Sequence, residues 1–338
     1  MVPKFVSKPK TTLRVPLRMK LIISTASSSL IILKMIKKPF LNSTKTVISN
    51  RLTMTHVSKI ILNYSAMNKA KQNKIIFFGN GPLADFTKQC IENSGTCEIV
   101  FHAKNKADLD EVKRLKSANP SLFGILASFG VIIKSDILEL FEPIGILNIH
   151  PSLLPKYRGA SPIESAILNG DQDFSVSVMK LVKAMDAGPI YYQTTIKSDE
   201  FSSAYPAKSE IYQALSTRAT TWLIEHLNSL PTLIPQNDEK ATYTSKFDTS
   251  MSQLDLKKPA MNLLNQIRAF QNFPKSKLKI GDHECIILEA HLDKKTEADN
   301  RAKIKFTCGD NQNIIIDRLQ PLGRKPMDAN SFYNGYMK

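Results

Sequence analysis

The stretch Ile144–Gly159, IGILNIHPSLLPKYRG, decides how the rest of this chain is interpreted. It begins with a short, mostly apolar run, residues 145–149, bounded by turn residues, as is typical of a buried parallel strand. Asn148 and His150 interrupt the apolar pattern, and because they lie two residues apart they project to the same side of a strand. The carboxyl ends of strands in an open α/β sheet border the ligand crevice. The stretch therefore predicts a polar pair at a ligand site, with a pair that only caps the strand as the alternative.

Alternating strands and helices surround this stretch and predict an α/β fold with a Rossmann-like, mainly parallel sheet. The strand at residues 145–149 would lie within that sheet, covered by helices on both faces. The other predicted strands are residues 74–79, 98–101, 122–128, 174–182 and 190–196, and the predicted helices are residues 83–93, 107–117, 135–141, 161–169 and 204–230.

Beyond residue 258 the apolar pattern changes after one amphipathic helix, residues 260–272, to a period of two. Four antiparallel strands are predicted there, at residues 276–280, 284–292, 302–307 and 313–319, and a small β-barrel is the natural closure for such a run. The chain is therefore divided into a basic N-terminal segment, a catalytic domain, a linker and a C-terminal β-barrel domain, at residues 1–73, 74–231, 232–258 and 259–338.

The N-terminal segment carries most of the net charge of the chain, which is +16. Residues 1–73 contain 14 of the 46 Lys and Arg residues and none of the 30 acids, so 32 basic residues remain to balance those acids. A basic, acid-free segment rich in Ser and Thr is typical of a mitochondrial transit peptide. We therefore expect a disordered leader that directs the protein to the mitochondrial matrix. A basic nucleic-acid arm or a secretory signal is the alternative.

The sequence argues against two kinds of cofactor site. Gly79, Gly81 and Ala84 match the G-x-G-x-x-A turn of dinucleotide folds, but no acid ends the second predicted strand to hold a ribose. The glycines are interpreted as a tight strand-to-helix turn. The four cysteines show no C-x-x-C spacing and the six histidines no H-x-x-x-H pair, which argues against a structural zinc site.

Asp186 follows a predicted strand, in the loop MDAGP at residues 185–189. Asp before Gly-Pro is an ordinary turn former, and this stays the alternative interpretation. If the fold brings Asp186 to His150, the carboxylate favours the charged imidazolium and orients it. Asn148 adds an amide donor, so the three could stabilise an oxygen that becomes negative in a tetrahedral intermediate. No Ser or Cys lies in a nucleophile elbow, so the attacking group should belong to the substrate.

These residues resemble a known family. Asn148-x-His150, the following residues SLLP, and Asp186 in a D-x-G loop are similar to the folate-dependent formyltransferases, which move a formyl group from 10-formyltetrahydrofolate to an amine. Three C-terminal stretches, TYTSK at 242–246, IRAF at 267–270 and LQPLGRKPM at 319–327, resemble in the same order the members that formylate initiator methionyl-tRNA. The resemblance covers about residues 74–335.

The resemblance implies a role for several groups of residues. Asn148, His150 and Asp186 would be catalytic. Folate would be bound by Phe129, Gly130, Val131, Ile132, Ser152, Leu153, Leu154 and Pro155. The initiator tRNA would be contacted by Lys156, Arg158, Arg268, Lys275, Arg324 and Lys325, although lysines on a barrel are often only solvated. The resemblance also implies 10-formyltetrahydrofolate as formyl donor, no metal, no DNA partner, no stable membrane insertion and a monomer.

The sequence departs from the family in two places. Residues 79–82, GNGP, are not the usual G-T-P form, and residues 101–107 lack the long basic loop of bacterial relatives, so tRNA contact is expected to rest more on the barrel. The alternatives are a formyltransferase of a small amine such as glycinamide ribonucleotide, or a hydrolase that uses water; neither would need the barrel. A non-catalytic RNA-binding protein would not need the three polar residues.

Overall fold

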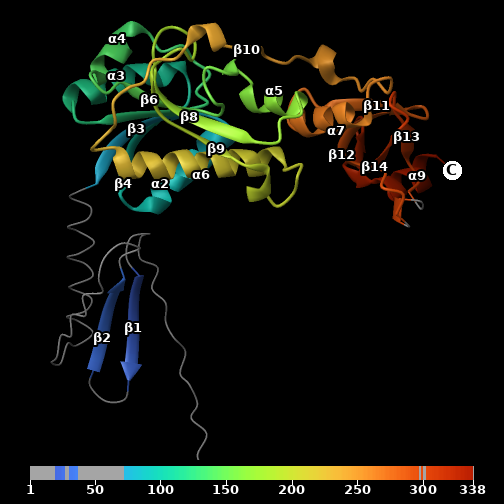
Figure 1. Ribbon diagram of the computed structural model, residues 1–338, viewed down its shortest axis with the longest axis horizontal. Coiled ribbons are helices and arrows are strands. Elements are labelled where there is room, and N and C mark those ends of the chain that lie inside the picture. Colours follow the sequence, from blue (N-terminus) through green and yellow to red (C-terminus); the bar gives the residue numbers. More distant parts are fainter. Residues whose placement is uncertain (1–19, 27–29, 37–71, 297, 300–301, 338) are drawn as a thin grey trace, which may run out of the picture.

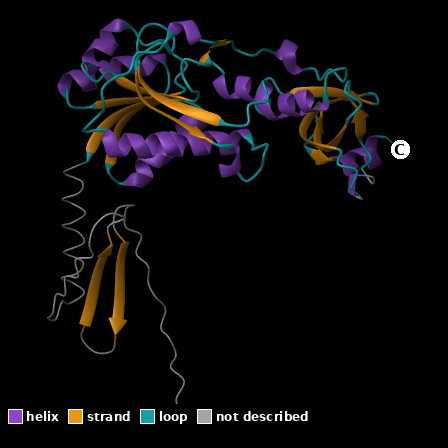
Figure 2. Cartoon of the chain, in the orientation of Figure 1, coloured by secondary structure: helices purple, strands orange, loops and turns teal. Residues whose placement is uncertain are grey.

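The computed structural model describes residues 20–26, 30–36, 72–296, 298–299 and 302–337 of the chain. Figure 1 shows a larger α/β unit, coloured from blue-green to yellow, and a smaller unit in orange and red that ends at the C-terminus. In Figure 2 the strands of the larger unit form one sheet between helices, whereas the smaller unit is mostly strands. The predicted two-unit architecture is confirmed.

The larger unit is built on a six-stranded sheet with the order β4-β3-β5-β6-β8-β9. The first four strands pair in parallel, and β8 and β9 are added antiparallel. The strands are β3 (Asn73–Gly79), β4 (Cys97–Ala103), β5 (Phe123–Ala127), β6 (Ile146–His150), β8 (Phe174–Lys180) and β9 (Ile190–Ile196). The mainly parallel sheet is therefore confirmed.

Helices cover both faces of this sheet because its strands are apolar on both sides. Ile75 and Phe77 pack with α2, α5 and α6, whereas Ile76 and Phe78 pack with α3 and α4, and all four side chains are fully buried. Such alternation follows from the two-residue period of a strand. The helices are α2 (Pro82–Ser94), α3 (Leu109–Ala118), α4 (Ser135–Leu138), α5 (Pro162–Leu168) and α6 (Lys208–His226).

The G-x-G-x-x-A residues form the strand-to-helix turn between β3 and α2. A Cβ on Gly79 would lie 2.4 Å from the carbonyl oxygen of Ala127, so only glycine fits there. Gly81 has φ of 94°, a conformation that glycine adopts at no steric cost. Pro82 begins α2, where its missing N–H is not needed.

The smaller unit is an antiparallel sheet with the order β11-β12-β14-β13, and β15 pairs with β14. Within the described residues no pairing joins β11 to β13, so the sheet is an open half-barrel. The predicted helix at 260–272 ends earlier, and β15 and α9 were not predicted. The elements are α7 (Ala260–Ala269), β11 (Ser276–Ile280), β12 (His283–Leu292), β13 (Lys305–Thr307), β14 (Asn313–Pro321), β15 (Met327–Asp328) and α9 (Ala329–Tyr336).

The segment predicted as a linker, residues 232–258, packs first against the larger unit and then, from Met251, against the smaller one. Its strand β10 (Tyr243–Thr244) pairs in parallel with β7 (Arg158–Gly159), and Ile234 forms a bridge to Ile190 in β9. The first part of this segment is therefore part of the fold of the larger unit. Short 3₁₀ helices complete the fold: η1 (Lys106–Asp108), η2 (Glu139–Phe141), η3 (Ser198–Glu200), η4 (Asp238–Lys240) and η5 (Thr249–Ser252).

Within residues 1–73, which the sequence predicted as a disordered leader, the structure describes a hairpin. It consists of β1 (Lys20–Ala26) paired antiparallel with β2 (Leu30–Ile36). The Ile residues of both strands favour this structure, since β-branched residues favour extended backbone. The rest of the leader, up to residue 71, lies outside the described residues. Among the described residues, none of the helices combines the length and apolar character needed to cross a membrane.

Candidate active site

Strand β6 places Asn148 and His150 at its carboxyl end, as the sequence predicted. The strand lies inside the sheet, between β5 and β8. Both side chains are 5% exposed, which is unusual for polar residues and requires that they be hydrogen-bonded. They are therefore held rigidly by the sheet rather than carried on a mobile loop.

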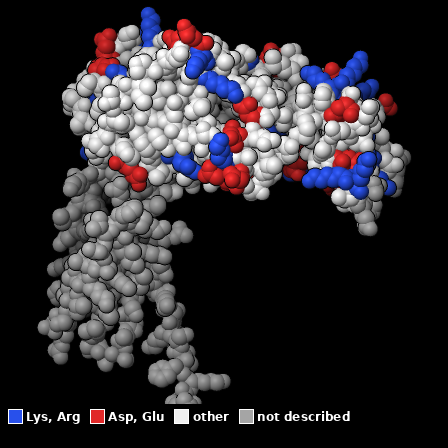
Figure 3. Space-filling view, in the orientation of Figure 1, with Lys and Arg blue, Asp and Glu red and all other residues white. Residues whose placement is uncertain are grey.

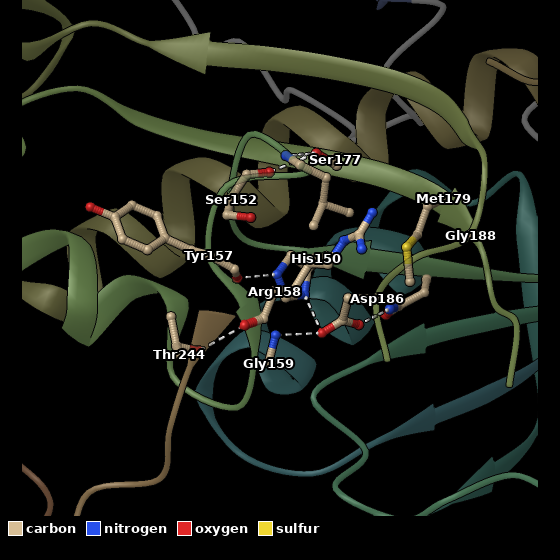
Figure 4. A network of polar contacts seen from close by, with 12 residues as sticks. His150, Ser152, Tyr157, Arg158, Gly159, Ser177, Met179, Asp186, Gly188 and Thr244 are labelled. Carbon is tan, nitrogen blue, oxygen red and sulfur yellow. Dashed lines mark hydrogen bonds and ion pairs between the residues drawn. The ribbon is translucent and has the colours of Figure 1, made fainter. Parts of the chain in front are cut away.

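Asp186 lies against this pair. Its Oδ2 atom is 3.6 Å from Nδ1 of His150 (Figure 4). Its Oδ1 atom is 3.5 Å from Nδ2 of Asn148. The backbone N–H of Gly159 donates a hydrogen bond of 2.8 Å to Oδ2 and fixes the carboxylate. The loop between β8 and β9 thus brings together the three residues that the sequence singled out.

The contacts of this trio leave two donors available. Nε2 of His150 lies 2.9 Å from the carbonyl oxygen of Tyr157, and since a carbonyl only accepts, this nitrogen carries the proton. Both contacts to Asp186 are longer than the usual 2.7–3.2 Å of an N–H···O bond. Nδ2 of Asn148 and a protonated Nδ1 of His150 can therefore donate to a substrate oxygen beside the carboxylate.

The contacts of this trio depend on two residues whose backbone is in the left-handed conformation. Asp186 has φ of 47° and Tyr157, whose carbonyl accepts from His150, has φ of 60°. Such conformations are costly for residues other than glycine, at about 1–3 kcal/mol each, and cluster at functional sites. The surrounding hydrogen bonds therefore have to hold both residues in place.

The residues predicted to bind folate fall into two groups. Phe129 is buried and packs edge-on against Phe78, with ring centroids 5.6 Å apart, and Leu154 is buried against Met179 and Ile190. Both side chains therefore belong to the core, and the folate contact of these two residues stays a prediction. An apolar loop residue has the same appearance in sequence whether it faces the core or a ligand.

Ser152 is also used internally. Its hydroxyl donates to the carbonyl of Lys156 at 2.6 Å, and its own carbonyl accepts from Ser177 at 2.6 Å (Figure 4). This bond shapes the loop, and the folate contact of Ser152 stays a prediction. The remaining predicted residues are accessible to different degrees: Val131 and Pro155 are half-buried, and Gly130, Leu153 and Ile132 are exposed, Ile132 at 88%. Met185, in the loop before Asp186, is 66% exposed.

Arg158 does not lie where the sequence predicted a tRNA contact. The residue is 2% exposed, and its Nε and Nη2 atoms donate to Oε1 of Gln236 at 3.1 and 2.8 Å. Nη2 also pairs with Asp238 at 2.6 Å. The phosphate contact is corrected to an internal role, which the sequence could not reveal because the partners lie about 80 residues further along the chain.

The other predicted tRNA residues differ in exposure. Lys156 is exposed and pairs with Asp171 at 2.9 Å. Arg268 is half-buried, lies 5.4 Å from the Tyr205 ring, and has a pKa lowered by burial. Arg324 and Lys325 are exposed in the turn after β14, and Lys275 is half-buried. Figure 3 shows Lys and Arg side chains exposed over the smaller unit, with acids among them.

Two hollows elsewhere on the surface contain none of the trio. One of about 270 Å³ lies between the end of α5 and α7 and is lined by Arg268 and Tyr205. The other, of about 620 Å³, lies at the amino ends of β3 and β5. Within the described ranges, no cluster of three or more His, Cys, Asp or Glu side chains is arranged to hold a metal ion.

Comparison of the sequence with known protein families divides the chain into two parts that correspond to the larger and the smaller unit. Residues 19–227 match the sequence profile described as formyl transferase, and residues 246–337 match that of the formyl transferase C-terminal domain. The first match begins inside the acid-free segment. The methionyl-tRNA formyltransferases of Borrelia duttonii (strain Ly) and Borrelia hermsii (strain HS1 / DAH) are 32% and 34% identical over 241 and 239 residues. These alignments cover 68% and 67% of this chain and 76% and 75% of the relatives.

Solved structures with the same fold have much lower sequence identity. The methionyl-tRNA formyltransferase from Clostridium thermocellum superposes with a TM-score of 0.56 at 18% identity, covering 74% of this chain and 99% of its own. HypX from Aquifex aeolicus in complex with tetrahydrofolic acid superposes with a TM-score of 0.55 at 12% identity, covering 79% and 48%. At these identities the likeness concerns the fold alone.

Proposed function

Since this chain belongs to the formyl transferase family, we propose that it transfers the formyl group of 10-formyltetrahydrofolate to the α-amine of initiator methionyl-tRNA. The formyl-transferring activity follows from the family, and the acceptor is our proposal. The observation that carries the proposal is the convergence of Asn148 Nδ2 and His150 Nδ1 on Asp186 at 3.5 and 3.6 Å. The relatives named methionyl-tRNA formyltransferase and the match to the C-terminal domain support the acceptor.

The chemistry of the transfer follows from this geometry. A free α-amine has a pKa of about 7.7–8.0, so a useful fraction is neutral near neutral pH. Its lone pair attacks the formyl carbon, and the formyl oxygen becomes an oxyanion that accepts from Asn148 and from the protonated ring of His150. Asp186 holds the ring and can accept the amine proton, directly or through a water molecule. The bond from the formyl carbon to N10 of the folate then breaks, and N10 takes up a proton.

The surroundings of the trio suit a folate. Ile132, Leu153 and Met185 expose apolar surface in loops that carry or adjoin the trio. Ligand sites of this kind combine apolar walls with a few polar groups that fix orientation. We propose that these three side chains border the pterin.

We further propose that the protein acts in translation initiation in the mitochondrial matrix. The support is the composition of residues 1–73, which are basic and acid-free. Residues 1–18 and residues 1–73, each fused to a fluorescent protein, would locate the targeting information. Entry of the longer fusion into mitochondria would support the proposal, and a uniform cytosolic signal for both fusions would overturn it.

The activity is tested with 10-formyltetrahydrofolate and two acceptors, charged initiator tRNA and glycinamide ribonucleotide. We expect formylation of the tRNA-bound methionine only. In the His150→Ala variant we expect kcat to fall by about 100- to 1,000-fold, the effect of removing one oxyanion donor. Product from the small amine alone would overturn the proposed acceptor, and full activity of His150→Ala would overturn the proposed mechanism.

A further inference from the structure

Gln236 lies in the segment between the two units and contacts the catalytic loop. Its Nε2 atom donates to the carbonyl oxygens of Asp186 and Gly188 at 2.8 and 2.7 Å. Its Oε1 atom accepts from Nε and Nη2 of Arg158 at 3.1 and 2.8 Å. A carboxamide has two donor hydrogens and two acceptor lone pairs, so all four are used. This side chain therefore has one orientation, and that orientation fixes the two carbonyls.

The two carbonyls belong to backbone that needs external support. Asp186 is in the left-handed region with φ of 47°, which a residue with a Cβ adopts only when the structure around it compels it. At Gly188 a Cβ would lie 1.8 Å from the carbonyl oxygen of Lys180, so the loop passes directly over β8. Gln236 donates hydrogen bonds to the loop at both of these residues, on either side of Ala187.

Arg158 links the hydrogen bonds of Gln236, here called the clamp, to the Asp186 carboxylate. Its side chain orients Gln236, while the N–H of the next residue, Gly159, donates to Oδ2 of Asp186 at 2.8 Å. Both residues form β7, and the N–H of Arg158 donates to the carbonyl of Thr242 at 2.8 Å. The backbone and the carboxylate of Asp186 are thus held from one short strand that is itself paired with the connecting segment.

We propose that Gln236 is a positioning residue for formyl transfer. Arg158 orients its carboxamide, the carboxamide holds residues 186–188, and this loop aims the Asp186 carboxylate at His150 and Asn148. The inference rests on formyl transfer, which the family establishes, and does not depend on which amine is the acceptor. It assigns a role at the site to a segment that joins two units and contacts no reacting atom.

A purely structural role for Gln236 makes a different prediction from a positioning role. Loss of a structural contact lowers the folded fraction and leaves kcat of the folded protein unchanged. Loss of a positioning contact lowers kcat and leaves KM for folate nearly unchanged, because the carboxylate acts in the transition state. Amide hydrogen exchange in residues 183–189 reports the same loop without any substrate.

The experiment compares two variants of the full chain with the wild type. Gln236→Met has a similar length and no hydrogen bonds, and Gln236→Glu still accepts from Arg158 but sets a carboxylate oxygen against two carbonyls. For both we expect kcat to fall by about 10- to 100-fold, the cost of misplacing a group by about 1 Å, with faster exchange in residues 183–189. Glu239→Gln, an exposed change in the same segment, is the matched control and should behave as the wild type.

Two results would overturn the positioning role: an unchanged kcat with unchanged loop exchange, or a loss of activity that matches the loss of folded protein. If the wild type formylated no methionyl-tRNA, the proposed acceptor would fall. The exchange comparison would then still decide the role of Gln236, since faster exchange supports the clamp and unchanged exchange contradicts it.

Discussion

The loop after β6 and the turn after β14 are both basic, but their charged side chains have opposite surroundings. In the loop, Arg158 is 2% exposed, and its guanidinium donates hydrogen bonds to Gln236 and Asp238. In the turn, Arg324 and Lys325 are exposed to solvent. The difference teaches that a basic residue beside the reacting groups serves the geometry of the site, whereas one on the smaller unit faces solvent, where a polyanion can reach it.

The largest effect that tests this comparison is expected from Arg158→Ala. The change leaves Gln236 without its partner, so we expect kcat to fall by about 100-fold through misplacement of the catalytic loop. Hydrogen bonds to a charged group contribute about 1.5–3 kcal/mol, and we expect the free energy of unfolding to fall by a similar amount. Denaturant unfolding and steady-state kinetics measure the two effects.

The neighbouring Lys156 provides the contrast for this experiment. Its amine is exposed, so Lys156→Ala should leave the free energy of unfolding within about 0.5 kcal/mol of the wild type. Arg158→Ala could instead keep the stability and kcat of the wild type and lose only salt-dependent tRNA binding. That result would refute the internal role of Arg158 and support a contact with a tRNA phosphate.

A smaller effect, confined to binding, is expected from the double change Arg324→Ala and Lys325→Ala. Each phosphate contact that is lost should reduce the slope of log K against log salt by about one. The unfolding free energy and kcat at saturating tRNA should not change, because neither side chain contacts the larger unit's site. Filter-binding at several salt concentrations measures the slope. Lys106→Ala, an exposed change on the larger unit, is the control. An equal slope for the double variant and the control would show that this turn does not contact the tRNA.

The smallest effect concerns pH and the smaller unit alone. Burial disfavours the charged form of His291, but hydrogen bonds to Asp317 at 2.7 Å and Asp299 at 3.2 Å outweigh it and raise the pKa of His291 above 6.5. A group whose pKa is raised on folding stabilises the fold fully below its unfolded pKa and loses that contribution as the pH rises through the folded pKa. We therefore expect stability to decrease from about pH 6.5 upward.

Because the His291 ring is part-exposed, the change should stay below about 1 kcal/mol. Thermal unfolding of the wild type and of His291→Gln between pH 6 and 9 measures it. The variant should lose the slope above pH 6.5, and an identical slope in both proteins would show that another group titrates.

Much of the fold could be predicted from the sequence because it is written in local patterns. The apolar runs gave the parallel strands, and the period of two after residue 270 gave the antiparallel sheet. The short β15 and the final helix α9 were missed, since neither has a pattern that stands out from a loop. The two-residue spacing of Asn148 and His150 on a strand was enough to place them together.

The rest of the site could not be predicted, because its parts lie far apart in the chain. Gln236 is 50 residues from Asp186 and 78 from Arg158, and the composition around it is that of a linker. An apolar residue such as Phe129 or Leu154 has the same appearance in sequence in a core or in a ligand wall, and only the structure shows that these two pack against Phe78 and Met179.

The sequence alone determined the alternation of strands and helices that builds the sheet. It also determined that an amide and an imidazole lie on one side of a strand. The tertiary structure alone decided which donors remain available and which are used, burying Arg158 and leaving Nδ2 of Asn148 beside Asp186. The physical reason is that strand and helix periods are set by neighbouring residues. A hydrogen bond between side chains is set by whichever groups the fold brings within about 3 Å of each other.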